Sequence, residues 1–109
     1  MAVIEYQGVS VAIDDDGYLA EPENWNEDVA RAISENEGVG ELTGDMMDVI
    51  NFMRSYYKNY HSFPILNAVC KNVHQPQECV NEEFIDPLSA WKIAGLANPG
   101  EEVVSYLKR

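Results

Sequence analysis

The chain is predicted to form an α+β domain, in which an N-terminal β-hairpin packs on a bundle of about five short helices. Two patterns carry this prediction. Apolar residues alternate with period two only in the first 13 residues, and helical spacing takes over from residue 24 onward. With 109 residues, of which 46% are hydrophobic, the chain has the size of one domain with one core, spanning residues 1–109.

The hairpin is predicted over residues 2–13. Val9, Val11 and Ile13 alternate with small or polar residues, and the pair Gln7–Gly8 precedes them as a turn signal. The acidic run D-D-D-G at residues 14–17 is a further turn. Because two strands alone are only marginally stable in water, we expect the hairpin to pack on the helices.

The first two helices have clear start and stop signals. Asn24 or Asn26 can cap the first helix, and Gly38 can stop it. The second helix is predicted from Thr43 to about Tyr60. Its helical spacing is the strongest periodic signal in the chain, so we expect it to be the central helix of the core.

The second half of the chain is predicted to contain shorter helices. Pro64 opens a helix that runs to about residue 72, and residues 74–79 form a loop or the start of a short helix. Residues 86–95, which begin with Asp-Pro and end with Gly, form another helix. After the break N-P-G at residues 98–100, the last nine residues are predicted to form one or two helical turns.

The chain is strongly acidic, with 19 Asp and Glu against 7 Lys and Arg and a formal net charge of -12. Such a surface repels phosphate backbones and favours basic partner surfaces, although it is also typical of a merely solvated surface. Residues 49–73 fit a helix-turn-helix regulator that binds DNA, but they lack a basic face. The N-terminus has no signal-peptide pattern, and no apolar run is long enough to cross a membrane, so a cytoplasmic protein is expected.

The two cysteines differ in their surroundings. Cys70 belongs to an apolar helical stripe, which is typical of a small buried side chain. Cys79 lies in a more polar stretch and is expected to be more accessible, although Glu78 would raise rather than lower its thiol pKa. A disulfide between the two requires residues 71–78 to fold back, and a cytoplasmic setting disfavours it. The residues alone indicate no metal motif, cofactor site or enzyme.

Three stretches resemble the DsrC/TusE family of small sulfur-relay proteins, which includes the gamma subunit of dissimilatory sulfite reductase. They are D-G-Y-L-A-E-P-E-N-W-N-E-D-V-A at residues 16–30, V-I-N-F-M-R-S-Y-Y-K-N-Y-H-S-F-P at residues 49–64, and K-I-A-G-L at residues 92–96. The resemblance implies a hairpin with a helical bundle, followed by a C-terminal arm at residues 92–109. It also implies protein partners in sulfur transfer or sulfite reduction. In the family, a cysteine near the end of this arm accepts sulfur as a persulfide.

This chain departs from the family pattern in the arm. Trp91 stands where some family members have a second arm cysteine, and no cysteine follows K-I-A-G-L. No family sulfur-carrying residue can therefore be assigned here. The first hypothesis is a member with a cysteine-less arm that acts as a non-catalytic, partner-binding or regulatory subunit in sulfur metabolism. The alternative is a sulfur carrier that uses Cys79 with Cys70. Under either hypothesis, Trp91 and Lys92 are candidates for anchoring the arm or contacting a partner.

Overall fold

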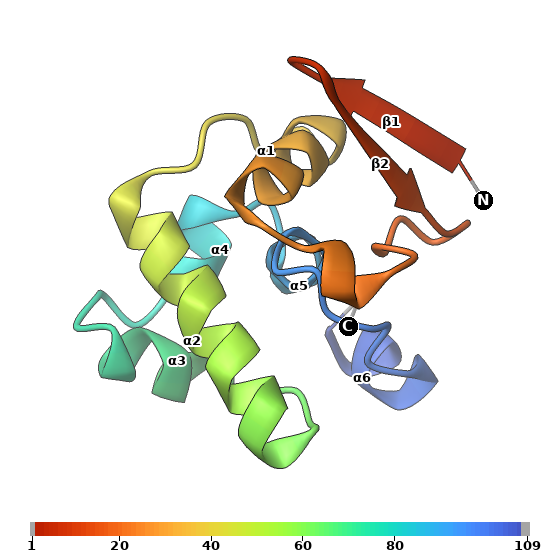
Figure 1. Cartoon of the computed structure of the whole chain (residues 1–109). Helices are drawn as coiled ribbons and strands as arrows, with labels where there is room; N and C mark the ends of the chain where they lie inside the picture. The colour runs from red at the N-terminus through yellow and green to blue at the C-terminus, as the bar shows by residue number, and fades with distance from the viewer. Residues whose placement is uncertain (1, 108–109) are drawn as a thin grey trace.

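The computed structural model describes residues 2–107, in which a two-stranded sheet precedes six α-helices and one 3-10 turn (Figure 1). The antiparallel strands β1 (Ala2–Tyr6) and β2 (Val9–Ile13) pair with Tyr6 opposite Val9. Gln7 and Gly8 between them have positive φ angles of 47° and 84°, as a tight hairpin turn requires. The predicted hairpin is confirmed, and so is the α+β class.

The helices follow in chain order, and all except α2 are short. They are the 3-10 turn η1 (Pro22–Asn24), α1 (Glu27–Asn36), α2 (Gly44–Tyr60), α3 (Leu66–Asn72), α4 (Cys79–Glu83), α5 (Pro87–Ile93) and α6 (Glu101–Leu107). The segment at residues 74–79 was predicted as a loop or the start of a short helix. It is mainly a loop, because α4 begins only at its last residue.

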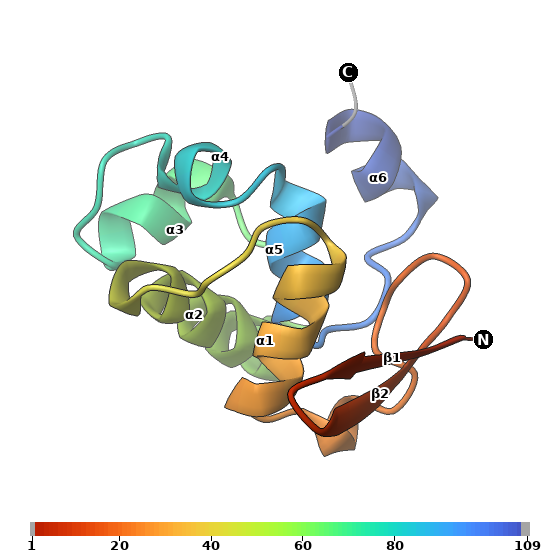
Figure 2. The same cartoon turned by 90° about the horizontal axis from the view of Figure 1, so that it is seen from above.

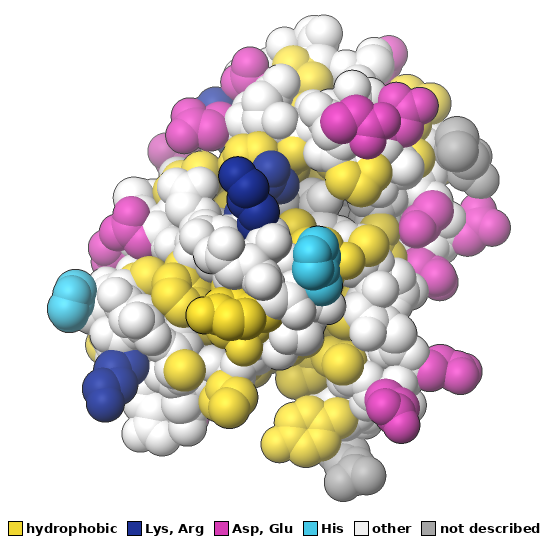
Figure 3. All heavy atoms as spheres, turned by 60° about the horizontal axis from the view of Figure 1, so that its bottom comes forward, with side chains coloured by type: hydrophobic (Ala, Val, Ile, Leu, Met, Phe, Trp, Pro, Cys, Tyr) yellow, Lys and Arg dark blue, Asp and Glu magenta, His cyan; other side chains and the backbone are white. Residues whose placement is uncertain are grey.

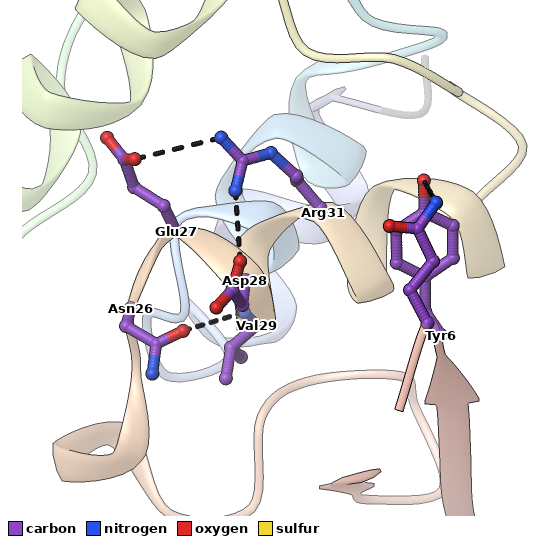
Figure 4. A network of polar contacts seen from close by, with 7 residues as sticks. Tyr6, Asn26, Glu27, Asp28, Val29 and Arg31 are labelled. Carbon is purple, nitrogen blue, oxygen red and sulfur yellow. Dashed lines mark hydrogen bonds and ion pairs between the residues drawn. The ribbon is translucent and has the colours of Figure 1, made fainter. Parts of the chain in front are cut away.

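The starts of the helices are set by local caps. Asn26, not Asn24, caps α1: its side-chain oxygen accepts a hydrogen bond of 2.9 Å from the backbone N–H of Val29 (Figure 4). On the same helix, Arg31 forms ion pairs with Glu27 and Asp28, also drawn in Figure 4. Thr43 and Asp86 cap α2 and α5 in the same way, which confirms the predicted starts of these two helices.

Helix α5 lies at the centre of the fold, where α1, α2, α4 and α6 all contact it (Figures 1 and 2). Six of its seven residues are buried, whereas α2 buries four of its seventeen. The expectation that α2 is the central helix is therefore wrong. Its periodicity reflects a single buried face packed against one side of α5, and this face continues into aromatic residues that are only partly covered.

The hairpin contacts α1, which separates it from α2 in Figure 2. The acidic turn that follows β2 is held by Asp14, whose carboxylate accepts hydrogen bonds from the backbone N–H groups of Asp16 and Tyr18. This confirms the predicted turn at residues 14–17. Among residues 2–107, the helices are all too short or too polar to span a bilayer.

Candidate functional site

Trp91, at the centre of α5, packs where the chain turns toward α6. Its side chain is fully buried, and its ring contacts Phe63 and Tyr57, with ring centroids 4.6 and 5.6 Å away. Its indole N–H donates a 2.7 Å hydrogen bond to the backbone oxygen of Ala97. One side chain thus joins the core to the backbone that leaves α5.

Two further side chains hold the end of α5. The indole N–H of Trp25 donates to the backbone oxygen of Ile93 at 2.9 Å, and the guanidinium of Arg54 donates to that of Ala94 at 2.7 Å. The guanidinium also lies 3.9 Å from the centre of the Trp25 ring, a cation–π contact. The last carbonyls of a helix lack partners within it, and these side chains supply partners from distant parts of the chain.

Gly95 makes this close approach feasible. Its φ angle is +71°, in the left-handed region that favours glycine, and a Cβ atom at this position would collide with the Trp25 ring. We call residues 93–97 the arm root, and Trp25, Arg54 and Trp91 the clasp. The clasp fixes the path of the backbone at the arm root.

Lys92, next to Trp91, is directed to the body of the domain. Its ammonium lies 3.5 Å from the Glu37 carboxylate, and both side chains are largely buried. It also lies 5.4 Å from the centre of the Tyr18 ring. Burial, followed by the negative charges of Asp16 and Asp14, raises the pKa of Tyr18 to about 12, so this phenol stays neutral at physiological pH.

Glu37 also accepts a hydrogen bond from the hydroxyl of Ser89 at 3.2 Å, so one carboxylate binds two residues of α5. Trp91 and Lys92 therefore lie together beside the arm root, and both contact other parts of the domain.

The two cysteines lie away from the arm root and form a disulfide between α3 and α4. Each is 1% exposed, and their Cα atoms are 5.8 Å apart. The expectation that Cys79 is accessible is wrong, and the disulfide that the sequence disfavoured is present. The intervening loop folds back because the backbone N–H of Gln75 bonds to the oxygen of Cys70, while the Gln75 side chain bonds to the oxygen of Asp45.

Two surface hollows have linings suited to binding, and one of them borders the arm root. One of about 550 Å³ lies between the C-terminal half of α2 and residues 95–97, and it is lined by Arg54 and Lys58. Burial lowers the pKa of Arg54. Figure 3 shows Lys and Arg side chains gathered near the middle of this face, with acidic side chains around its edge.

The second hollow is an apolar groove of about 640 Å³ between α6 on one side and α3 and α4 on the other. In Figure 3 it is the notch at the lower edge, bordered by hydrophobic side chains. Within residues 2–107, His, Cys, Asp and Glu side chains form no group of three that could hold a metal ion. The geometry thus provides a fixed arm root beside a basic hollow, and a separate apolar groove, which are features suited to binding.

Sequence reasoning identified Trp91 and Lys92 but missed Trp25 and Arg54 as parts of the clasp. Each makes a contact with α5 over a long sequence separation of 68 and 40 residues. A signal was present: Trp25, Arg54 and Gly95 each fall in one of the three stretches that carry the family resemblance. These three stretches are far apart in the sequence but meet at the arm root.

Comparison with known proteins agrees with this geometry. The family model described as DsrC like protein matches residues 5–103. A sulfurtransferase TusE homolog from Haemophilus influenzae is 32% identical, over 91% of this chain and 98% of its own. The gamma subunit of a dissimilatory-type sulfite reductase from Nitratidesulfovibrio vulgaris is 31% identical, over 91% and 96% of the two chains.

A solved structure has the same fold. The oxidised gamma subunit of the dissimilatory sulfite reductase from Archaeoglobus fulgidus superposes with a TM-score of 0.77 at 26% identity, covering 92% of this chain and 98% of that chain. The match therefore extends over nearly the whole length of both molecules.

Proposed function

This chain is a member of the DsrC-like protein family, and from that premise we propose that it binds protein partners in sulfur metabolism without itself carrying sulfur. The relatives are named as sulfurtransferases and as a sulfite reductase subunit, which are roles that require a protein partner. In this proposal, the chain keeps the domain that such partners recognise and lacks the sulfur-carrying cysteine of the arm.

The observation that carries this proposal is the state of the thiols. A persulfide forms through a thiolate that a sulfur donor can reach. The segment after the arm root has no cysteine, and Trp91 fills the position before K-I-A-G-L with a buried indole. The remaining cysteines, Cys70 and Cys79, are buried and bonded to each other.

The hydrogen bonds between the clasp and the backbone of the arm root support the same proposal. A sulfur-carrying arm needs freedom to enter a partner's active site. Here three side chains bind the backbone oxygens of the arm root, so the first residues of the arm are held inside the folded domain. We propose that Trp91 and Lys92 act as internal anchors of the arm root rather than as direct partner contacts.

A thiol-free variant tests whether the function depends on sulfur carriage. Cys70→Ala together with Cys79→Ala removes every thiol in the chain, and circular dichroism checks its fold. In the source organism, tagged wild-type and thiol-free chains should capture the same set of sulfur-metabolism proteins. Loss of these partners from a folded thiol-free variant would contradict the proposal.

The alternative is a sulfur carrier that uses Cys79, with Cys70 as the resolving thiol, and the sulfurtransferase names of the relatives favour it. It requires Cys79 to become accessible after reduction of the disulfide. Alkylation of the reduced, folded protein by iodoacetamide discriminates between the two. Rapid modification of Cys79 under native conditions would favour the sulfur-carrier alternative. Protection of Cys79 from iodoacetamide until the protein unfolds would contradict that alternative.

A further inference from the structure

The apolar groove beside α6 has the character of a binding surface for a helix. Phe63, Pro64 and Leu66 line one wall, Val80 lies on the floor, and Val103 and Leu107 line the wall formed by α6. Its volume of about 640 Å³ is in the range of pockets that bind ligands. Two large apolar side chains at its edges, Ile65 and Tyr106, remain 75% and 69% exposed.

The two walls are held differently. On one side, the disulfide between Cys70 and Cys79 joins α3 to α4, which fixes the spacing of the helices that form this wall and the floor. On the other side, α6 packs on α5 and has no buried residue. The groove thus has one rigid wall, and a second wall whose apolar side chains the domain covers only in part.

The charges around the groove favour a basic binding partner. Among the described lining residues, Glu78 and Glu102 stand at opposite sides and carry negative charge, and there is no Lys or Arg. The chain as a whole has a formal charge of -12. A second copy docking symmetrically would bring like charges together, which disfavours self-association. A basic partner would gain from both the rim and the overall field.

We infer that this groove binds an amphipathic helix of a protein partner, with apolar side chains facing the groove and Lys or Arg side chains pairing with Glu78 and Glu102. Such a helix presents apolar anchors at positions i, i+3, i+4 and i+7, which can face the apolar side chains of both walls. The inference deepens the proposed function, because it names the surface and the chemistry of the partner.

The test uses a labelled model peptide and the full chain. The probe is an amphipathic helical peptide of about 18 residues made of Leu and Lys, with fluorescein at its end. Fluorescence anisotropy at an ionic strength of about 0.15 M measures its affinity. A counterpart with Glu in place of Lys should bind at least about tenfold more weakly, because its charges repel the rim.

Two isoleucines provide a matched pair of variants. Ile65→Glu places a charge at the groove, whereas Ile85→Glu makes the same change at a site that does not line it, and both side chains are more than half exposed. Both variants add one negative charge, so general attraction of a basic peptide would strengthen in both. The inference predicts that Ile65→Glu weakens binding by about tenfold or more, while Ile85→Glu leaves it within about twofold.

The rim is tested separately by Glu102→Gln, with the exposed Glu23→Gln in the 3-10 turn as its control. Only the first should weaken binding of the Leu-Lys peptide, by about two- to fivefold. Equal effects of the two isoleucine variants, or no binding of the peptide at all, would overturn the inference. A dimer of the free chain that Ile65→Glu dissociates would also overturn it, because a second copy would then cover the groove.

The inference and the proposed function can fail separately. Transfer of sulfur to this chain would contradict the proposed function without affecting peptide binding. Conversely, failure of the peptide assay would remove the groove as the partner site, while the absence of a reactive thiol would still stand.

Discussion

Trp91 combines two roles that are usually separate, filling the core and holding a backbone segment. Its ring packs between Tyr57 and Phe63, and its N–H reaches the oxygen of Ala97. A cysteine at this position would provide neither the volume nor the hydrogen bond. Trp91 thus makes the arm root part of the folded domain.

Trp91→Ala should destabilise the protein by about 3–5 kcal/mol, because it leaves a large cavity in the core. Urea unfolding followed by circular dichroism measures this change in the free energy of unfolding. Tyr60→Ala removes an aromatic ring that is 66% exposed and serves as the control, with an expected change within about 0.5 kcal/mol. Equal effects of the two substitutions would show that Trp91 is not a packed anchor.

Glu83 provides a pH-dependent test at the residue scale. Burial, with the negative charges of Asp45, Glu82 and Asp48, raises the pKa of its carboxyl above the ordinary value for glutamate. One of its oxygens is buried and has no hydrogen-bond partner among residues 2–107. Because the pKa of Glu83 is higher in the folded state than in the unfolded state, its carboxyl favours folding at low pH. This contribution to the free energy of unfolding is fully present below the unfolded-state pKa and is lost as pH rises through the folded-state pKa.

Glu83→Gln should therefore gain stability relative to the wild type as pH rises from about 4 to about 7. Thermal unfolding of both proteins across this range measures the gain, and the exposed Glu23→Gln should show no comparable trend. A stability difference between Glu83→Gln and the wild type that stays constant with pH would contradict this assignment.

At the scale of elements, α3 and α4 are short helices that depend on one another. They have seven and five residues, fewer than isolated helices need for stability in water. The disulfide joins them across a sequence separation of nine, and the folded-back loop includes His74 with a φ angle of +59°. Together these features hold the wall and floor of the groove.

Removal of the disulfide, by reduction or by Cys70→Ala with Cys79→Ala, should lower the free energy of unfolding by about 2–3 kcal/mol, as expected for closing a loop of this length. Urea titration with and without dithiothreitol measures the loss in the wild type. The thiol-free variant is the control and should not respond to the reductant. An identical midpoint for oxidised and reduced wild-type protein would contradict the proposed role of this cross-link.

Local signals in the sequence were sufficient for the elements that depend on neighbouring residues. The Gln7–Gly8 turn, the caps at Thr43 and Asp86 and the final helix at residues 101–107 follow from residue types within a few positions of each other. Asn24 and Asn26 could not be separated in this way, because both have the right side chain.

Long-range contacts could not be predicted from the same signals. The burial of Cys79 depends on how residues 73–78 fold over the N-terminal end of α2, through the bond from Gln75 to Asp45. The clasp depends on residues from η1–α1, α2 and α5 meeting at one point. The central position of α5 also escaped prediction, because seven residues are too few to show a strong period.

At the scale of the whole molecule, the family domain extends over residues 5–103. Residues 108 and 109, at the end of the arm expected from the sequence, lie outside the described residues. What the described part offers is an acidic domain with a fixed arm root, a basic hollow and an apolar groove. These features fit a protein that acts through its surface.

Intact-mass spectrometry measures directly whether this chain accepts sulfur. The oxidised and the pre-reduced chain are each incubated with a cysteine desulfurase and cysteine, with the Haemophilus influenzae relative as a parallel sample. We expect an unchanged mass for this chain in both states, while the relative gains about 32 Da for each sulfur atom. A gain of about 32 Da on this chain that maps to Cys70 or Cys79 would show that it carries sulfur.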